Sequence, residues 1–193
     1  MAEVPSTFQL APGSTAPDFS LADAIGTVHT PPSLAAGKLG LLVVFACNHC
    51  PFVIHLADAL GRFAARIAGQ GLATVAIAAN DVDRYPQDGP ALMPAFAATH
   101  GWDFPYLHDA TQEVARAYAA ACTPDFYLFD AGLKLVYAGQ FDDSRPGRGE
   151  ADGGDLARAV EDLLAGRDTP PPWYPSTGCN IKWIPGKEPA YFG

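Results

Sequence analysis

The chain has 193 residues, is 49% hydrophobic and 17% charged, and carries a formal net charge of −9. These values are typical of a compact folded protein, and we expect one domain over residues 1–193. The acidic balance disfavours nucleic acid and membrane surfaces as partners, because both attract clustered Lys and Arg. Residues 1–18 contain no basic, apolar leader and no later apolar run is long enough to span a membrane, which predicts a cytoplasmic protein.

Two short strands are expected before the first cysteine. Residues 13–21 lead into an alternating segment, which is followed by a turn at Gly26 and a second short strand around Val28. This pattern predicts an N-terminal β-hairpin. Residues 39–46 then form a short, continuous apolar run, which is typical of a strand buried on both faces of a sheet.

A helix is expected directly after the motif Cys47-Asn48-His49-Cys50. From Pro51 to Ile67 the apolar residues recur at helical spacing, and Gly69 and Gly71 mark the end of that pattern. Residues 72–79 form another apolar strand. The two strands and the helix predict a βαβ unit with the cysteine pair at its first strand-to-helix junction.

The elements expected after this unit alternate between helix and strand, and then change to a hairpin. Helices are expected at 91–100 and 112–120 with a strand at 104–107 between them, then a hairpin of strands 125–129 and 133–138, and a last helix at 155–164. The core is therefore expected to cover about residues 13–166. The segment 167–193 contains six prolines and several aromatic residues, which predicts an extended tail that packs on the domain.

The four cysteines are candidates for redox chemistry or metal binding, because cytosolic thiols are kept reduced. Two cysteines separated by two residues at a helix N-terminus can approach disulfide distance, and the helix dipole favours a thiolate there. We expect this stabilisation of the thiolate to be largest for Cys47, which would then act as the nucleophile. Cys50 would be the resolving thiol. His49 is expected to stabilise the Cys47 thiolate and to make the couple more oxidising.

A second motif, Cys122-Thr123-Pro124-Asp125, leads into a predicted strand. A Cys-x-x-Cys motif followed far along the chain by X-Pro at the start of a hairpin strand resembles the thioredoxin fold. This resemblance implies an α/β thioredoxin-like fold, with the N-terminal hairpin and the C-terminal tail as extensions. It also implies a cis peptide bond at Pro124 and substrate binding by Pro124 and the Thr123 backbone.

Other segments narrow the resemblance to the redoxin or AhpC/TSA branch, and within it to an uncharacterised peroxiredoxin-like subgroup. The segments that carry it are Ala16-Pro17-Asp18-Phe19, Asn80-Asp81, Tyr85-Pro86-Gln87-Asp88, the stretch from Gln140 to Pro146 and the stretch from Ser176 to Trp183. The peroxiredoxin pattern Pro-x-x-x-Thr/Ser-x-x-Cys is absent, because Gly40 and Val44 precede Cys47 at those spacings. The buried acid of thioredoxins is also missing from strand 41–45, and His49, Asp81 or Asp125 could replace it as proton acceptor.

Four further residues are candidates for auxiliary roles. Cys122 and Cys179 could each be a buried, inert cysteine or a third redox thiol, and Cys122 is the better placed because Cys179 needs the tail to fold back. Asn80 is expected to cap a strand end, which could also border the active site. Arg145 is expected in a surface ion pair, with an anion ligand as the alternative.

We interpret the chain as an enzyme, a thiol-disulfide oxidoreductase that uses the Cys47/Cys50 couple without a bound cofactor. Its partners would be protein or small-molecule disulfides and thiols, with a cellular dithiol as one candidate reductant. The alternative is a peroxiredoxin-like thiol peroxidase with Cys47 as the peroxidatic cysteine. A less favoured alternative is zinc or copper(I) binding through these cysteines and a histidine, since structural zinc sites usually carry two paired ligand sets.

Overall fold

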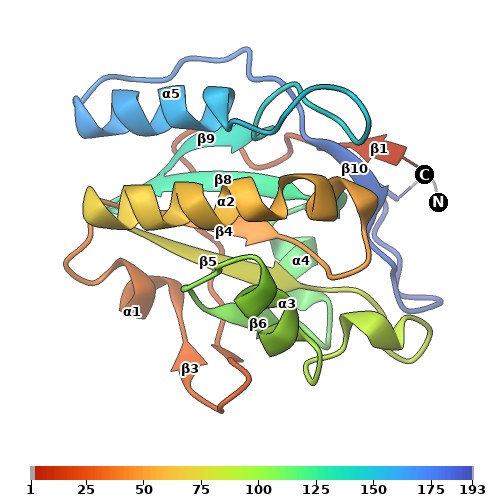
Figure 1. Ribbon diagram of the computed structural model, residues 1–193. Coiled ribbons are helices and arrows are strands. Elements are labelled where there is room, and N and C mark those ends of the chain that lie inside the picture. Colours follow the sequence, from red (N-terminus) through yellow and green to blue (C-terminus); the bar gives the residue numbers. More distant parts are fainter. Residues whose placement is uncertain (1–2, 193) are drawn as a thin grey trace.

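A five-stranded sheet forms the centre of the computed structural model, which describes residues 3–192 (Figure 1). The strand order is β6-β5-β4-β8-β9. Strands β4, β5 and β6 are parallel to one another, whereas β8 is antiparallel to both β4 and β9. Their bounds are β4 Gly40–Phe45, β5 Leu72–Ala78, β6 Tyr106–His108, β8 Asp125–Asp130 and β9 Leu135–Gly139.

Helices cover both faces of this sheet. Helices α2 (Pro51–Gly69), α3 (Met93–Thr99) and α5 (Gly154–Leu164) pack on one face, and α1 (Pro31–Ala35) and α4 (Glu113–Ala117) pack on the other. All six residues of β4 are buried, because alternate side chains enter the two cores. The continuous apolar run before Cys47 is therefore the central strand, as expected.

The N-terminal hairpin is confirmed as β2 (Leu21–Ala22) paired with β3 (Val28–His29). The helix expected at 112–120 is shorter than predicted, because Gln112 has a φ of 63° and Ala119 a φ of 51°, and neither value is helical. The hairpin strand expected at 133–138 begins later, at Leu135, because Leu133 has a φ of 58° and belongs to the turn.

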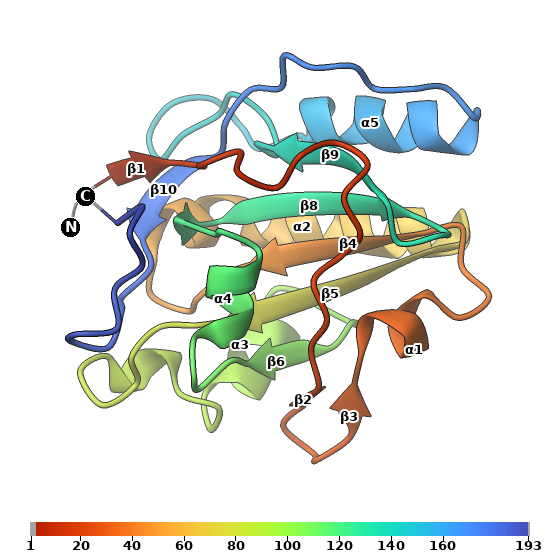
Figure 2. The same ribbon diagram turned by 180° about the vertical axis from the view of Figure 1, so that it is seen from behind.

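A second, three-stranded sheet lies beside the cysteine motif and was not predicted. Strand β10 (Thr177–Asn180) lies between β1 (Glu3–Pro5) and β7 (Cys122–Thr123) and is antiparallel to both. Figure 2 shows β1 and β10 side by side, near the start of β8. The C-terminal tail thus folds back over the domain, and its Ile181 and Trp183 are buried.

None of the helices among residues 3–192 is long and apolar enough to cross a lipid bilayer.

Candidate active site

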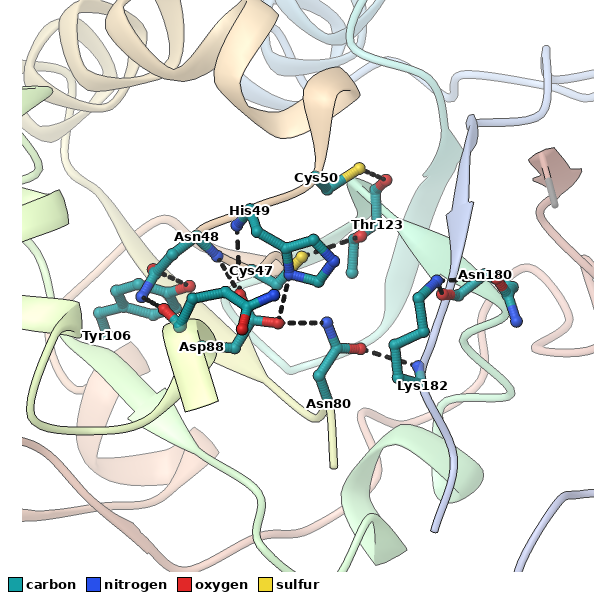
Figure 3. Close-up of polar contacts among 11 residues, drawn as sticks. Cys47, Asn48, His49, Cys50, Asn80, Asp88, Tyr106, Thr123, Asn180 and Lys182 are labelled. Carbon is teal, nitrogen blue, oxygen red and sulfur yellow. Dashed lines mark hydrogen bonds and ion pairs between the residues drawn. The ribbon is translucent and has the colours of Figure 1, made fainter. Parts of the chain in front are cut away.

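The two cysteines of the motif meet at Thr123 (Figure 3). Cys47 follows strand β4, and Cys50 is the N-cap of α2, where Pro51 starts the helix. The Cys47 sulfur lies 3.4 Å from the Thr123 hydroxyl, and the Cys50 sulfur lies 3.1 Å from the Thr123 carbonyl oxygen, to which the protonated form of Cys50 donates. Both thiols are free, and they are only 1% and 0% exposed. A substrate disulfide therefore reaches them only if covering atoms move.

The two thiols have opposite acidities. A hydrogen bond from Cys47, with further bonds from Cys179, Thr123 and the Val53 backbone, lowers the pKa of Cys50 to about 5. The same bond to Cys50 raises the pKa of Cys47 well above its usual value, and burial and the charge of Asp88 add to this. We expected the helix N-terminus to lower the pKa of Cys47 most, whereas these interactions lower the pKa of Cys50, which is the N-cap of α2.

Asp88 organises the loop between the two cysteines. It lies at the end of the short 3-10 helix η1 (Pro86–Asp88), and its side chain is fully buried. Its Oδ1 accepts the backbone N–H groups of Asn48 at 2.8 Å and His49 at 3.2 Å. Its Oδ2 lies 2.6 Å from His49 Nδ1, which must carry the proton because an ionised carboxylate only accepts. Asp88 thus fixes both the loop and the tautomer of His49.

The imidazole of His49 stacks on Tyr85, with ring centroids 5.5 Å apart, and its Nε2 is buried without a hydrogen-bond partner. One nitrogen of His49, the Cys47 sulfur and an Asp88 oxygen all lie within 4.8 Å of one another. Since Nδ1 is occupied by Asp88, Nε2 is the ring atom free to accept a proton. The structure therefore brings together His49 and Cys47, as the sequence predicted.

The other two candidate proton acceptors have different partners. The Asp81 carboxylate accepts the Asp83 N–H at 3.1 Å. Asp125 accepts the hydroxyls of Ser6 at 2.7 Å and Tyr127 at 3.0 Å, and burial raises the pKa of Asp125 to about 6. Of the three candidates, only His49 has an atom within 4.8 Å of the Cys47 sulfur in the donor group described above, so His49 is the best placed.

Asn80 connects this network to the C-terminal tail. Its side-chain amide donates to Asp88 at 2.8 Å, and its carbonyl oxygen accepts the Lys182 backbone N–H at 2.8 Å. Lys182 in turn donates its ammonium group to the backbone and side-chain oxygens of Asn180. Asn80 therefore borders the site, as the sequence analysis considered. Through Asp88 it connects the loop between Cys47 and Cys50 to the residues that follow β10.

The peptide bond between Thr123 and Pro124 is cis, as the resemblance implies. The backbone of Thr123, however, is already paired within the protein. Cys179 of β10 lies opposite Thr123, and an added Cβ on Gly178 would overlap the Thr123 carbonyl. The expected pairing of Thr123 with a bound peptide is therefore excluded while β10 stays in place.

The structure reverses the expected order of the two remaining cysteines. Cys122 is fully buried and donates its thiol to the Pro124 carbonyl at 3.5 Å, and burial raises its pKa well above the usual value. Cys179 instead lies opposite Thr123, and burial together with an interaction with the Cys50 thiol raises the pKa of Cys179 to about 12. Cys179 is thus the thiol that reaches the redox pair.

Arg145 is not in the expected surface ion pair. It is half-buried and donates to the backbone carbonyls of Asp142 and Ser144 and to the side-chain oxygen of Gln140. Together with Pro124 it lines a cavity of about 20 Å³, which is the size of one water molecule. Its guanidinium therefore braces the loop after β9 and is not directed at Cys47.

The metal alternative requires donors that are free to bind. The one group of donors that could hold an ion among residues 3–192 is Cys47, His49 and Asp88, and it contains a single cysteine. Both oxygens of Asp88 already accept two hydrogen bonds each. This donor set does not match the thiolate-rich sites that zinc and copper(I) prefer, so the cluster is better described as a hydrogen-bond network.

Sequence reasoning missed the roles of Asp88, Lys182 and Asn48. The segment from Tyr85 to Asp88 contributes to the family resemblance, but no local pattern links it to the cysteine motif, which lies almost forty residues earlier in the chain. Asn48 donates its amide to the Gln87 carbonyl and accepts the Tyr106 hydroxyl. A buried acid after a strand end is the one signal that could have drawn attention to Asp88.

The comparisons with known proteins agree with this fold. The AhpC/TSA family matches residues 12–138. The chain is 47% identical to a hypothetical protein of Sinorhizobium meliloti of known structure, with 94% of this chain and 99% of that one covered and a TM-score of 0.90. It is 45% identical to an uncharacterised conserved protein of Geobacillus kaustophilus, with 96% and 98% covered and a TM-score of 0.91.

A more distant structure is a secreted disulfide oxidoreductase of Mycobacterium tuberculosis, at 20% identity, 74% and 94% coverage and a TM-score of 0.58, which is a likeness of fold alone. No curated protein matches the chain. The family match covers well over half of the 193 residues and includes the cysteine motif and Pro124. The protein has the thioredoxin-like fold, and it belongs to the AhpC/TSA family.

Proposed function

We propose that the protein is a thiol-disulfide oxidoreductase in which Cys47 and Cys50 alternate between dithiol and disulfide. The observation that carries the proposal is that both sulfurs contact Thr123, Cys47 at its hydroxyl and Cys50 at its carbonyl. The two cysteines themselves lie between the end of β4 and the start of α2. Two thiols that share one proton at neutral pH are ready to form a disulfide, because one of them is already a thiolate.

The reaction proceeds in two exchange steps. Cys47, after losing its proton, attacks one sulfur of a substrate disulfide, and the other substrate sulfur leaves as a thiolate that takes up a proton. The Cys50 thiolate then attacks Cys47 in the mixed disulfide, which forms the Cys47–Cys50 disulfide and releases the second substrate thiol. The low pKa of Cys50 suits this resolving step, because Cys50 needs no base at neutral pH.

His49 is the proposed acceptor of the Cys47 proton. Its Nδ1–H is held by Asp88 and its Nε2 is free and buried, which is the arrangement that a general base requires. When Cys47 becomes a thiolate, the Thr123 hydroxyl at 3.4 Å is placed to donate to it. Asp88 itself opposes the Cys47 thiolate through its charge, so His49 must balance two anions.

The proposed partners are protein or small-molecule disulfides, with a cellular dithiol as the electron donor. Small disulfides are favoured as substrates, because β10 already pairs with β7 at Thr123 and a peptide would have to displace β10 before it could pair there. We also propose a cytoplasmic location, because the cytoplasm keeps thiols reduced and all four cysteines are free.

A thiol peroxidase with Cys47 as peroxidatic cysteine is the second candidate, and it is favoured by membership of the AhpC/TSA family. The surroundings of Cys47 disfavour it. Peroxide cleavage requires hydrogen-bond donors that polarise the leaving oxygen, whereas the charged group that acts on Cys47 is the Asp88 carboxylate. Rapid formation of a Cys47 sulfenic acid with hydrogen peroxide would support the peroxidase instead.

The decisive test is turnover of insulin and of a small aromatic disulfide with dithiothreitol as donor. Wild-type protein should turn over at least one of them, and Cys47→Ser should not. Cys50→Ser should accumulate a mixed disulfide on Cys47 that mass spectrometry detects. Cys122→Ser is the matched control and should retain activity. No turnover by the wild type, or full turnover by Cys47→Ser, would exclude the proposal.

A further inference from the structure

The tail strand β10 places a third thiol next to the redox pair. In the antiparallel pairing of β10 with β7, Cys179 is directly opposite Thr123. Side chains of directly opposite residues lie on the same face of a sheet, with Cβ atoms about 4.5–5.5 Å apart. The Thr123 side chain points to Cys47, because its hydroxyl lies 3.4 Å from the Cys47 sulfur. The Cys179 side chain therefore points to the same place.

Cys50 is the central sulfur of the three. Its thiol bonds to the carbonyl of Thr123, the residue paired with Cys179, and α2, which begins just after Cys50, contacts β10. Both Cys47 and Cys179 lower the pKa of Cys50. All three cysteines belong to one buried cluster, in which Cys47, Cys50 and Cys179 are at most 4% exposed. Cys122 differs, because its thiol is bonded to the Pro124 carbonyl.

The position of Cys179 is also fixed by its neighbour. Gly178 comes so close to β7 that a side chain on it would overlap the Thr123 carbonyl. Strand β10 therefore packs tightly against strand β7. On the C-terminal side of Cys179, the Ile181 N–H donates to the Ala121 carbonyl at 3.0 Å, and the Lys182 N–H donates to the side-chain oxygen of Asn80. Backbone contacts on both sides of Cys179 therefore hold it opposite Thr123, the residue that both cysteines of the motif contact.

We propose that Cys179 is an internal exchange partner of the redox pair, which converts the Cys47–Cys50 disulfide into a Cys50–Cys179 disulfide. This inference rests on the proposed function, which supplies the first disulfide. The Cys179 sulfur attacks the Cys50 sulfur, the Cys47–Cys50 bond breaks, and the proton of Cys179 passes to Cys47. No electron is gained or lost. The exchange frees Cys47 and ties the tail strand to α2 by a covalent bond.

The test uses Cys47→Ser, in which three of the four cysteines remain. The variant is oxidised with diamide, unfolded in urea, blocked with N-ethylmaleimide and digested with trypsin. Cleavage after Lys and Arg places Cys50 in peptide 39–62, Cys122 in peptide 117–134 and Cys179 in peptide 168–182. We expect peptides 39–62 and 168–182 to be joined and peptide 117–134 to carry maleimide, with the loss of two of the three reactive thiols.

Cys47→Ala is a second variant with the same expectation, and Cys47→Ser/Cys179→Ser is the control that should form no joined peptides. A link between 39–62 and 117–134, or full maleimide labelling of Cys50 and Cys179, would overturn the inference. Turnover of insulin or of the small aromatic disulfide by the wild type separates the two proposals. Turnover of either substrate without the Cys50–Cys179 link refutes only the role of Cys179, and absence of turnover with both substrates refutes the proposed function whatever the link shows.

Discussion

The Asp88 carboxylate accepts the Nδ1–H of His49 at 2.6 Å, so the residue that orients the imidazole is also the one whose charge opposes a thiolate at Cys47. Orientation and electrostatics act in opposite directions here. The carboxylate holds His49 ready to accept a proton, and at the same time it raises the pKa of the thiol that must lose that proton.

Asp88→Asn separates these two effects. In a Cys50→Ser background, we expect the substitution to lower the pKa of Cys47, because one neighbouring negative charge is removed. The pKa is measured from the rate of iodoacetamide alkylation against pH. Asp83→Asn, which changes an exposed acid on the same segment, should leave the profile unchanged. An unchanged or raised pKa in Asp88→Asn would show that the charge of Asp88 does not reach Cys47.

The acidity of Cys50 is directly measurable. With a pKa of about 5, Cys50 should be a thiolate across the neutral range, and ultraviolet absorbance of the reduced protein near 240 nm should rise with a midpoint near pH 5. This step should vanish in Cys50→Ser and persist in Cys122→Ser, since burial keeps Cys122 protonated. A step that survives the loss of Cys50 would assign the thiolate to another residue.

Asp125 should make the stability of the fold depend on pH. Its pKa is raised to about 6 by burial, above the ordinary value of 3.8, so the folded state binds more protons than the unfolded state between those values. Stability from this residue is present below about pH 4 and is lost as pH rises through 6. At pH 7 the loss corresponds to about 3 kcal/mol, from 1.36 kcal/mol per pKa unit.

Asp125→Asn removes this dependence. The free energy of unfolding of the variant minus that of the wild type should increase by about 2.4 kcal/mol between pH 4 and pH 7 in urea titrations. The pH slope is informative even if the variant loses a bond to Ser6 or Tyr127, because that loss is constant with pH. A difference that stays flat over this range would contradict the expectation.

Gly178→Ala tests the contact between β10 and β7. The added Cβ overlaps the Thr123 carbonyl, so we expect a loss of about 2–3 kcal/mol in the free energy of unfolding and faster maleimide labelling of Cys50. Gly69→Ala is the matched control, because an added Cβ there meets no atom within 4 Å at the end of α2. Equal stability of the two variants would mean that β10 is held loosely.

The sequence was sufficient for the elements whose signal is local. Strand β4, helix α2 and strand β5 were expected within a residue or two at most of their boundaries, because an apolar run and a helical period are visible without long-range information. Strands β1 and β10 were missed, since three or four residues of ordinary composition become strands only through pairing partners more than fifty residues away.

The same distinction holds in the site. The cysteine motif and the proline were found because their spacing is diagnostic. The acidity of Cys50, the role of Asp88 and the approach of Cys179 depend on which backbone groups meet after folding. Those contacts join residues 39 to 129 positions apart, and single-sequence patterns carry no information at that range.

Strand β10 has a consequence for how relatives of this protein are compared. The family match ends at residue 138, whereas the strand that covers Thr123 begins at Thr177. A chain that matches the family over the same stretch but continues differently would leave its Thr123 counterpart open to a peptide. Breadth of substrate choice would then be decided by residues that lie outside the shared catalytic region.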